Sequence, residues 1–122
     1  MMIGVGVDVV DIERFRRSLE RTPSMRLRLF TAGELESLAN RADPVPGLAA
    51  RFAAREAMMK SLGLGLGAFG FHDVWVARAL SGAPSLVVEG RALAIAEAAG
   101  VVRWHLSLSH SESVAIAQVV AE

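Results

Sequence analysis

The sequence predicts an α+β fold in which a mostly antiparallel sheet has helices packed on one side. The predicted elements follow one another in the order β-α-α-α-β-β-α-β-β. The last four predicted strands form two pairs, each joined by a short turn, which is typical of antiparallel hairpins. With 122 residues, of which 52% are hydrophobic, the chain is large enough for one core. We therefore expect residues 1–122 to form a single domain.

The first predicted element is a buried strand, MIGVGVDVV (residues 2–10), in which small and apolar residues alternate. Gly4 and Gly6 indicate either close packing or a close approach of another part of the backbone. Asp11 is a suitable N-cap for a helix over residues 12–21. Three apolar residues at helical spacing form the core stripe of this helix: Ile12, Phe15 and Leu19.

Two further helices are predicted in the middle of the chain. TAGE (residues 31–34) is a capping-box pattern and indicates a helix that extends toward Asn40. RADPVPG (residues 41–47) contains two prolines and predicts a loop. A long helix then covers about residues 48–62 and is ended by Gly63.

The C-terminal half begins with a glycine-rich loop, GLGLGAFG (residues 63–70). DVWVARA and SLVVE, joined by LSGAP, predict a hairpin over residues 73–89. GRALAIAEAAG (residues 90–100) predicts a short amphipathic helix. RWHLSLSH and SVAIAQVVA predict two more strands, which cover residues 103–121 around a turn at Ser111 and Glu112.

Composition and charge exclude several classes of function. The formal net charge is zero, so no overall field favours nucleic acid or a membrane surface as a partner. The chain contains no cysteine, which excludes a disulfide scaffold, thiol catalysis and thiolate metal sites. The N-terminus has no basic region before Asp8, and no apolar run approaches the roughly 18 residues of a membrane span. We therefore expect a cytoplasmic protein that binds neither nucleic acid nor membrane.

The only lysine of the chain, Lys60, lies four residues after Glu56. On a helix the two side chains are about 40° apart and share one face. The commonest meaning of this spacing is a surface ion pair, worth about 0.3–0.5 kcal/mol. The neighbours on this face, however, are small or apolar: Ala49, Phe52, Ala53 and Met59. Partly desolvated charges require a partner or a ligand, so a surface pair and a ligand site both remain open.

Asp8 lies within the first predicted strand, where aspartate is disfavoured. It is either a strand-end residue that bonds to the backbone or part of a functional site. Asp8 and Glu56 come from separate elements, and two carboxylates with few other ligand types nearby suit a hard cation. Mg²⁺ typically takes one or two carboxylates together with water and substrate phosphates.

The glycine-rich loop could let backbone N–H groups approach a phosphate. Helix capping already explains Gly63, so Gly65 and Gly67 are better candidates for ligand approach. The loop differs from a P-loop, because Lys60 precedes the glycines and the loop follows a helix instead of opening one.

The predicted strand HLSLSH places His105, Ser107 and Ser109 on one face and His110 on the other. No G-x-S-x-G motif is present, which argues against a serine hydrolase. A histidine at the end of a strand, such as His110, is more often a hydrogen-bonded structural residue than a catalyst. His72 is expected to be a surface residue.

Four motifs occur in one order along nearly the whole chain: GVGVDVVDIERF, RFAAREAMMKSLGLGLG, GAP and HLSLSHSESVAIAQVV. In these motifs the chain resembles the bacterial holo-acyl-carrier-protein synthases, the short 4'-phosphopantetheinyl transferases. The run ending in E-A-x-x-K is the most specific part. The resemblance implies the 4'-phosphopantetheinyl transferase fold. It also implies transfer of 4'-phosphopantetheine from coenzyme A to a serine of apo acyl carrier protein, with release of adenosine 3',5'-bisphosphate.

The resemblance also assigns roles to residues. It implies that Asp8 and Glu56 bind Mg²⁺ and that Lys60 faces the pyrophosphate of coenzyme A. A further group would hold the nucleotide: Arg51, Gly63, Gly65, Ser107, Ser109 and His110. The proton of the attacking serine would go to Glu56, to a metal-bound water or to His110, and the sequence does not separate these. The family usually has lysine where this chain has Arg55, which leaves the role of that position open.

The family is typically trimeric with sites between subunits, so the resemblance implies a homotrimer. Between residues 11 and 28, six arginines against three acidic residues leave a local charge of +3. Arg14, Arg17 and Arg21 form a stripe opposite the core stripe of their helix, and in this family such a helix receives the acidic carrier protein. Fatty-acid, polyketide and other carriers are all compatible with the sequence. The alternatives are a non-catalytic module that binds coenzyme A or a nucleotide, and a structural oligomerising domain.

Overall fold

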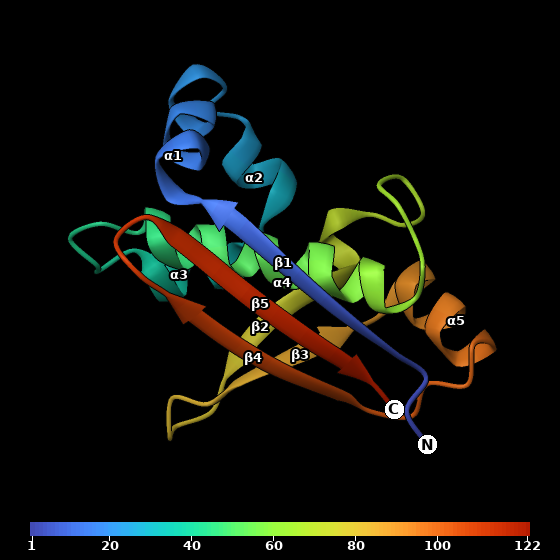
Figure 1. Ribbon diagram of the computed structural model, residues 1–122. Helices are drawn as coiled ribbons and strands as arrows, with labels where there is room; N and C mark the ends of the chain where they lie inside the picture. The colour runs from blue at the N-terminus through green and yellow to red at the C-terminus, as the bar shows by residue number, and fades with distance from the viewer.

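Five strands form two separate antiparallel sheets in the computed structural model, which describes residues 1–122 (Figure 1). The larger sheet has the order β1-β5-β4, and the smaller sheet pairs β2 with β3. The strands are β1 (Gly4–Asp11), β2 (Val74–Arg78), β3 (Pro84–Val88), β4 (Trp104–His110) and β5 (Val114–Ala121). The predicted α+β class with antiparallel pairing is confirmed, with the strands divided between two sheets.

Five α-helices and one short 3₁₀ helix complete the fold. They are α1 (Ile12–Arg21), α2 (Met25–Leu29), α3 (Ala32–Leu38), α4 (Val45–Ser61), η1 (Phe71–Asp73) and α5 (Gly90–Ala98). The predicted caps are confirmed. Asp11 Oδ1 accepts a hydrogen bond from the backbone N–H of Arg14 at 2.9 Å. Thr31 and Glu34 form the reciprocal bonds of a capping box.

The helices differ from the prediction at two points. Helix α2 was not predicted, because five residues are too few to show a helical period. Helix α4 begins at Val45, three residues earlier than predicted. Pro44 is its N-cap and Pro46 lies in its first turn, where a backbone N–H has no partner within the helix, so the prolines do not prevent helix formation there.

Helix α4 is the central element of the core and packs against both sheets (Figure 1). Its approach to β1 is unusually close. A Cβ atom at Gly4 would lie 1.8 Å from the carbonyl oxygen of Ser61, and one at Gly6 would lie 1.8 Å from that of Ala57. The predicted close packing of these glycines is therefore confirmed. It matters for function because it brings the middle of β1, with Asp8, against the last turns of α4.

The larger sheet is covered on one face only. Alternate residues of β5 on the inner face are fully buried against α4: Ala115, Ala117 and Val119. On the outer face of β1, Val5, Val7 and Val9 are 46%, 53% and 58% exposed. An open apolar strand face of this kind is uncommon on a soluble monomer. None of the helices is both long and apolar enough to span a membrane.

Candidate active site

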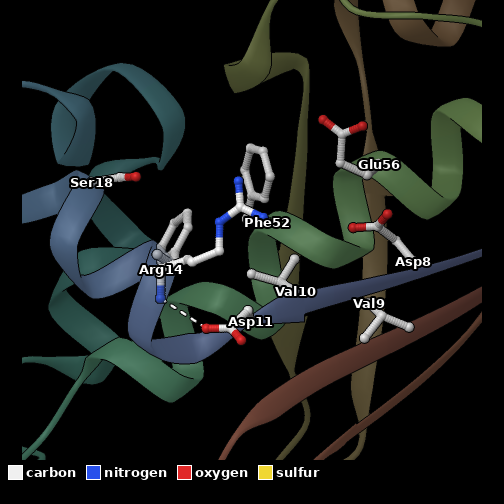
Figure 2. Close-up of a pocket in the computed structure, with 9 residues that line it drawn as sticks. Asp8, Val9, Val10, Asp11, Arg14, Ser18, Phe52 and Glu56 are labelled. Atoms are coloured by element: carbon white, nitrogen blue, oxygen red, sulfur yellow. Dashed lines mark hydrogen bonds between the residues drawn. The ribbon is translucent and has the colours of Figure 1, made fainter.

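A cavity of about 410 Å³ opens between β1, α1 and α4. Asp8 and Glu56 lie at one end, and Arg14 and Ser18 lie at the other (Figure 2). Apolar residues line the stretch between the two ends: Val10, Phe15 and Phe52, with Val9 contributing from β1 although its side chain lies on the outer face. The cavity therefore connects a pair of carboxylates to the first helix.

Lys60 forms its ion pair across to β1. Its Nζ lies 2.9 Å from Asp8 Oδ1 and donates to the carbonyl oxygen of Val7 at 3.1 Å. No ion pair forms between Lys60 and Glu56. The interpretation of these two residues as a surface ion pair along the helix is therefore wrong. The Lys60 side chain is 53% exposed, against 15% for Asp8. The ammonium is therefore partly desolvated, as expected, and it is the more exposed member of the pair.

The side chain of Glu56 is half-buried, and its carboxylate is not fully hydrogen-bonded. Its Oε1 atom is buried and has no hydrogen-bond partner. Burial, followed by repulsion from Asp8, raises the pKa of Glu56, and the charge of Lys60 opposes this effect. A buried carboxylate oxygen without a donor, beside a second carboxylate, is stabilised by a cation.

The two carboxylates fit Mg²⁺ better than a metal that needs a full set of protein ligands. No group of three or more acidic, histidine or cysteine residues could hold a metal here. Mg²⁺ commonly keeps several waters and takes one or two carboxylates together with phosphate oxygens. The orphaned oxygen of Glu56 and the adjacent Asp8 are compatible with that ligand set.

The glycine-rich loop follows α4, and Gly63 ends the helix as predicted. Gly63 has a φ of +69°, and the N–H of Leu64 donates to the carbonyl oxygen of Met59 at 2.9 Å. No atom lies within 4 Å of a Cβ built at Gly63, Gly65 or Gly67. The loop is therefore open on its outer side, next to the end of the helix that carries Lys60.

The residues of β4 lie as the alternation predicted. His105, Ser107 and Ser109 are exposed on the outer face of the larger sheet, and His110 is exposed at the end of the strand. None of these residues, and none of the loop glycines, lines the cavity that holds Asp8 and Glu56. A single chain therefore does not bring together all the predicted site residues.

Arg51 lies on a different side of α4. It is 1% exposed and lines a second cavity, of about 290 Å³, with residues that include Thr31, Trp75 and Arg78. Burial, and then the charge of Arg78, lower the pKa of Arg51 to about 10. Neither this cavity nor Arg78 was predicted from the sequence, although an arginine that ends an apolar strand before a turn is a visible signal.

The predicted arginine stripe is exposed on α1, which stands at one end of the molecule (Figure 1). Arg14, Arg17 and Arg21 form no ion pair within the chain. Arg16, on the same helix, differs, because it pairs with Glu13 at 2.9 Å and with Asp43 at 2.7 Å. The acids of this region thus neutralise Arg16 and leave the stripe free.

Comparisons with known proteins agree with one another. Residues 4–119 match the 4'-phosphopantetheinyl transferase superfamily. The chain is 52% identical over 122 residues to the holo-[acyl-carrier-protein] synthase of Pseudarthrobacter chlorophenolicus, an alignment that covers 100% of this chain and 99% of the relative.

Solved structures give the same result. The crystal structure of the holo-[acyl-carrier-protein] synthase of Neisseria meningitidis has a TM-score of 0.91 at 33% identity and covers 100% of this chain and 99% of that chain. The Bacillus anthracis holo-(acyl-carrier-protein) synthase, solved in complex with CoA (3',5'-ADP), has a TM-score of 0.83 at 30% identity. That alignment covers 100% of this chain and 97% of that chain.

Proposed function

Because the chain belongs to the 4'-phosphopantetheinyl transferase superfamily, as a holo-[acyl-carrier-protein] synthase, we propose how its own residues carry out the transfer. Coenzyme A is the donor, an acyl carrier protein serine is the acceptor, Mg²⁺ is required, and adenosine 3',5'-bisphosphate is released. The observation that carries this proposal is the cavity that both Asp8 and Glu56 line, with one oxygen of Glu56 unpaired and Lys60 paired with Asp8.

The reaction joins the serine oxygen to the β-phosphate of coenzyme A and breaks the bond from that phosphorus to the departing bisphosphate. Asp8 and Glu56 would hold Mg²⁺, which when bound neutralises charge on the pyrophosphate. Lys60 is half exposed on a flexible stem, so it can turn from Asp8 toward the leaving group and supply a second positive charge. Positioning and electrostatics then account for most of the rate.

The serine must lose its proton as it attacks. Glu56 is the first candidate for the acceptor, because it lies in the cavity, has an unpaired oxygen and has a raised pKa. His110 is the second candidate, but it does not line the cavity of its own chain. In this proposal His110 would have to act from an adjoining subunit.

An assembly would also explain the scattered nucleotide residues. We propose a homotrimer in which the outer face of the larger sheet is buried and each site is completed by a neighbour. The exposed valines of β1 and Ile116 of β5, which is 36% exposed, support this arrangement. Arg51 and the exposed β4 residues would then hold the nucleotide from the adjoining chain.

Val7→Arg is expected to disrupt the assembly, because it places a charge in the middle of the apolar face. Wild-type protein should sediment with the mass of three 13.0 kDa chains, and Val7→Arg with a smaller mass. Leu80→Arg is the matched control, since Leu80 is fully exposed in the β2–β3 turn, away from that face. A wild-type mass of one chain at micromolar concentration would refute the trimer.

Lys60→Arg is expected to slow turnover by about tenfold or more, although the charge is kept. An arginine at this position would form a bidentate pair with Asp8 and remain there, whereas the ammonium is a single point that can leave. Initial rates at saturating coenzyme A measure the effect. Wild-type rates for Lys60→Arg would mean that lysine has no special role at this position.

The proposed function is tested by incubating the protein with coenzyme A, Mg²⁺ and an apo acyl carrier protein. Mass spectrometry should show one added phosphopantetheine group on the carrier. A carrier whose acceptor serine is replaced by alanine is the control and should gain no mass. Binding of coenzyme A without transfer to any carrier in a small panel would favour the non-catalytic module instead.

A further inference from the structure

A buried ion pair lies at the cavity that contains Arg51 but takes no part in the proposed reaction. Arg55 is wholly buried and its partner Glu34 is 2% exposed. Nη2 of Arg55 pairs with Oε1 of Glu34, and Nη1 donates to Oε2 at 3.0 Å. Burying two charges costs free energy that their mutual attraction often fails to recover. The presence of this pair therefore requires a reason other than stability alone.

The guanidinium of Arg55 makes contacts that a lysine could not make together. Its Nε donates to the carbonyl oxygen of Phe71 at 2.9 Å while the two Nη atoms bind Glu34. The group also lies over the ring of Phe30, 5.3 Å from its centre. An ammonium is a compact point charge that cannot span both acceptors at once. Arginine is therefore the residue that can bond both oxygens of Glu34 and the carbonyl oxygen of Phe71 at the same time.

The carboxylate of Glu34 has no acceptor site left. Oε1 accepts the N–H of Thr31 at 3.0 Å, and Oε2 accepts the N–H of Val76 at 3.1 Å. With one bond from Arg55 to each oxygen, all of the roughly four acceptor positions of the carboxylate are filled. Glu34 lines the 290 Å³ cavity, yet it offers no free acceptor to the cations around it.

Arg51 lines the same cavity and has no acidic partner. Its Nη1 donates to the carbonyl oxygen of Gly47 at 3.2 Å, and its buried Nε has no hydrogen-bond partner. The second arginine of the cavity, Arg78, adds positive charge. A buried guanidinium in this state is stabilised by an anionic group that enters the cavity.

We propose that Arg55 is a positioning residue: by filling the acceptor sites of Glu34, it keeps Arg51 available to a phosphate group of coenzyme A. This inference rests on the proposed role of Arg51 in holding the nucleotide. Without the guanidinium of Arg55, the carboxylate of Glu34 has no cationic partner. Its negative charge then attracts Arg51, whose pKa it already raises. Arg51 is then neutralised from within the protein and loses its attraction for a phosphate.

Three variants separate this role from simple support of the fold, with affinity for coenzyme A measured by titration calorimetry. Arg55→Met should bind coenzyme A about tenfold more weakly, with a change in kcat of less than about threefold at saturation. Arg55→Lys should keep most of its affinity, because the ammonium still neutralises the charge of Glu34 although it cannot bond both carboxylate oxygens, and its melting temperature should fall. Glu34→Gln combined with Arg55→Met should regain wild-type affinity, because no charge remains to capture Arg51, and should stay less stable.

A purely structural role predicts that affinity follows the melting temperature. Equal losses of coenzyme A affinity in Arg55→Lys and in the double variant would therefore overturn the inference, even if Arg55→Met does not fold. Arg51→Met tests the premise. If Arg51→Met binds coenzyme A like wild type, the inference falls with the proposed role of Arg51. If Arg51→Met binds weakly while a folded Arg55→Met binds normally, only the role of Arg55 is refuted.

Discussion

Glu56→Gln is expected to lower turnover by at least about a hundredfold. The amide keeps the shape of the side chain but loses the charge that would hold Mg²⁺ beside Asp8. The substitution should also remove the first candidate for the proton acceptor, so saturating Mg²⁺ should not restore the rate. Turnover of coenzyme A by apo acyl carrier protein at increasing Mg²⁺ concentrations measures this effect.

The same variant gives a measurement that does not depend on activity. Burial and the nearby Asp8 raise the pKa of Glu56. A carboxyl group whose pKa is raised by folding stabilises the folded state at low pH, and this contribution is lost as the pH rises through the folded-state pKa. At neutral pH, the charged Glu56 therefore destabilises the metal-free protein. We expect metal-free Glu56→Gln to melt at the same temperature as wild type or higher.

Mg²⁺ should then raise the melting temperature of wild type and not that of Glu56→Gln. A ligand at 100 times its dissociation constant adds about 2.7 kcal/mol to the free energy of unfolding. Glu97→Gln, on the exposed face of α5, removes the same charge elsewhere and should respond to Mg²⁺ like wild type. Near-normal turnover of Glu56→Gln at saturating Mg²⁺ would show that this carboxylate is not a metal ligand.

Features set by neighbours in sequence were predictable. The cap formed by Asp11 and the capping box of Thr31 and Glu34 depend on side chains that reach only three residues along the chain. Close packing at the first strand could also be predicted, because Gly4 and Gly6 lack the side chain that would prevent it, but that α4 is the neighbour could not.

Features that depend on packing between distant segments were not predictable. The partner of Lys60 is Asp8, 52 residues away, and not the glutamate one turn before it. The cavity around Arg51 forms only when the strand that carries Arg78 packs beside α3 and α4. Glu34 showed the same limit: its capping role could be read from TAGE, but its ion pair with Arg55, 21 residues on, could not.

The arginine stripe of α1 gives the second large expected effect. Like charges at this spacing destabilise an isolated helix by a few tenths of a kcal/mol each, since such pairs repel. The chain neutralises Arg16 with its own acids and leaves Arg14, Arg17 and Arg21 without ion pairs. Arg14 also lines the far end of the cavity that contains Glu56 (Figure 2). An acidic carrier docked on the stripe would therefore have its serine close to the entrance of the site.

Arg14→Glu combined with Arg21→Glu is expected to weaken use of the carrier by at least about tenfold, because electrostatic steering can raise association rates by about 10–10³. Affinity for coenzyme A should change little, since Asp8, with its partner Lys60, and Glu56 lie at the other end of the cavity from the stripe. Separate measurements of KM for carrier and for coenzyme A distinguish the two effects.

The control is Arg91→Glu combined with Arg103→Glu, which makes the same change in net charge; Arg103→Glu also removes an exposed pair with Glu122 at 3.2 Å, so the melting temperature of the control is measured alongside its rate. Both residues are exposed, and α5 lies at the opposite end of the molecule from α1 (Figure 1). Raising the salt concentration from 0.15 M to 1 M shortens the Debye length from about 8 Å to about 3 Å, so wild type should lose carrier affinity while the stripe variant loses little more. If the control pair weakens carrier use as much as the stripe pair does, only net charge matters. If carrier affinity does not depend on salt, or if the stripe variant loses coenzyme A affinity equally, α1 is not the docking face.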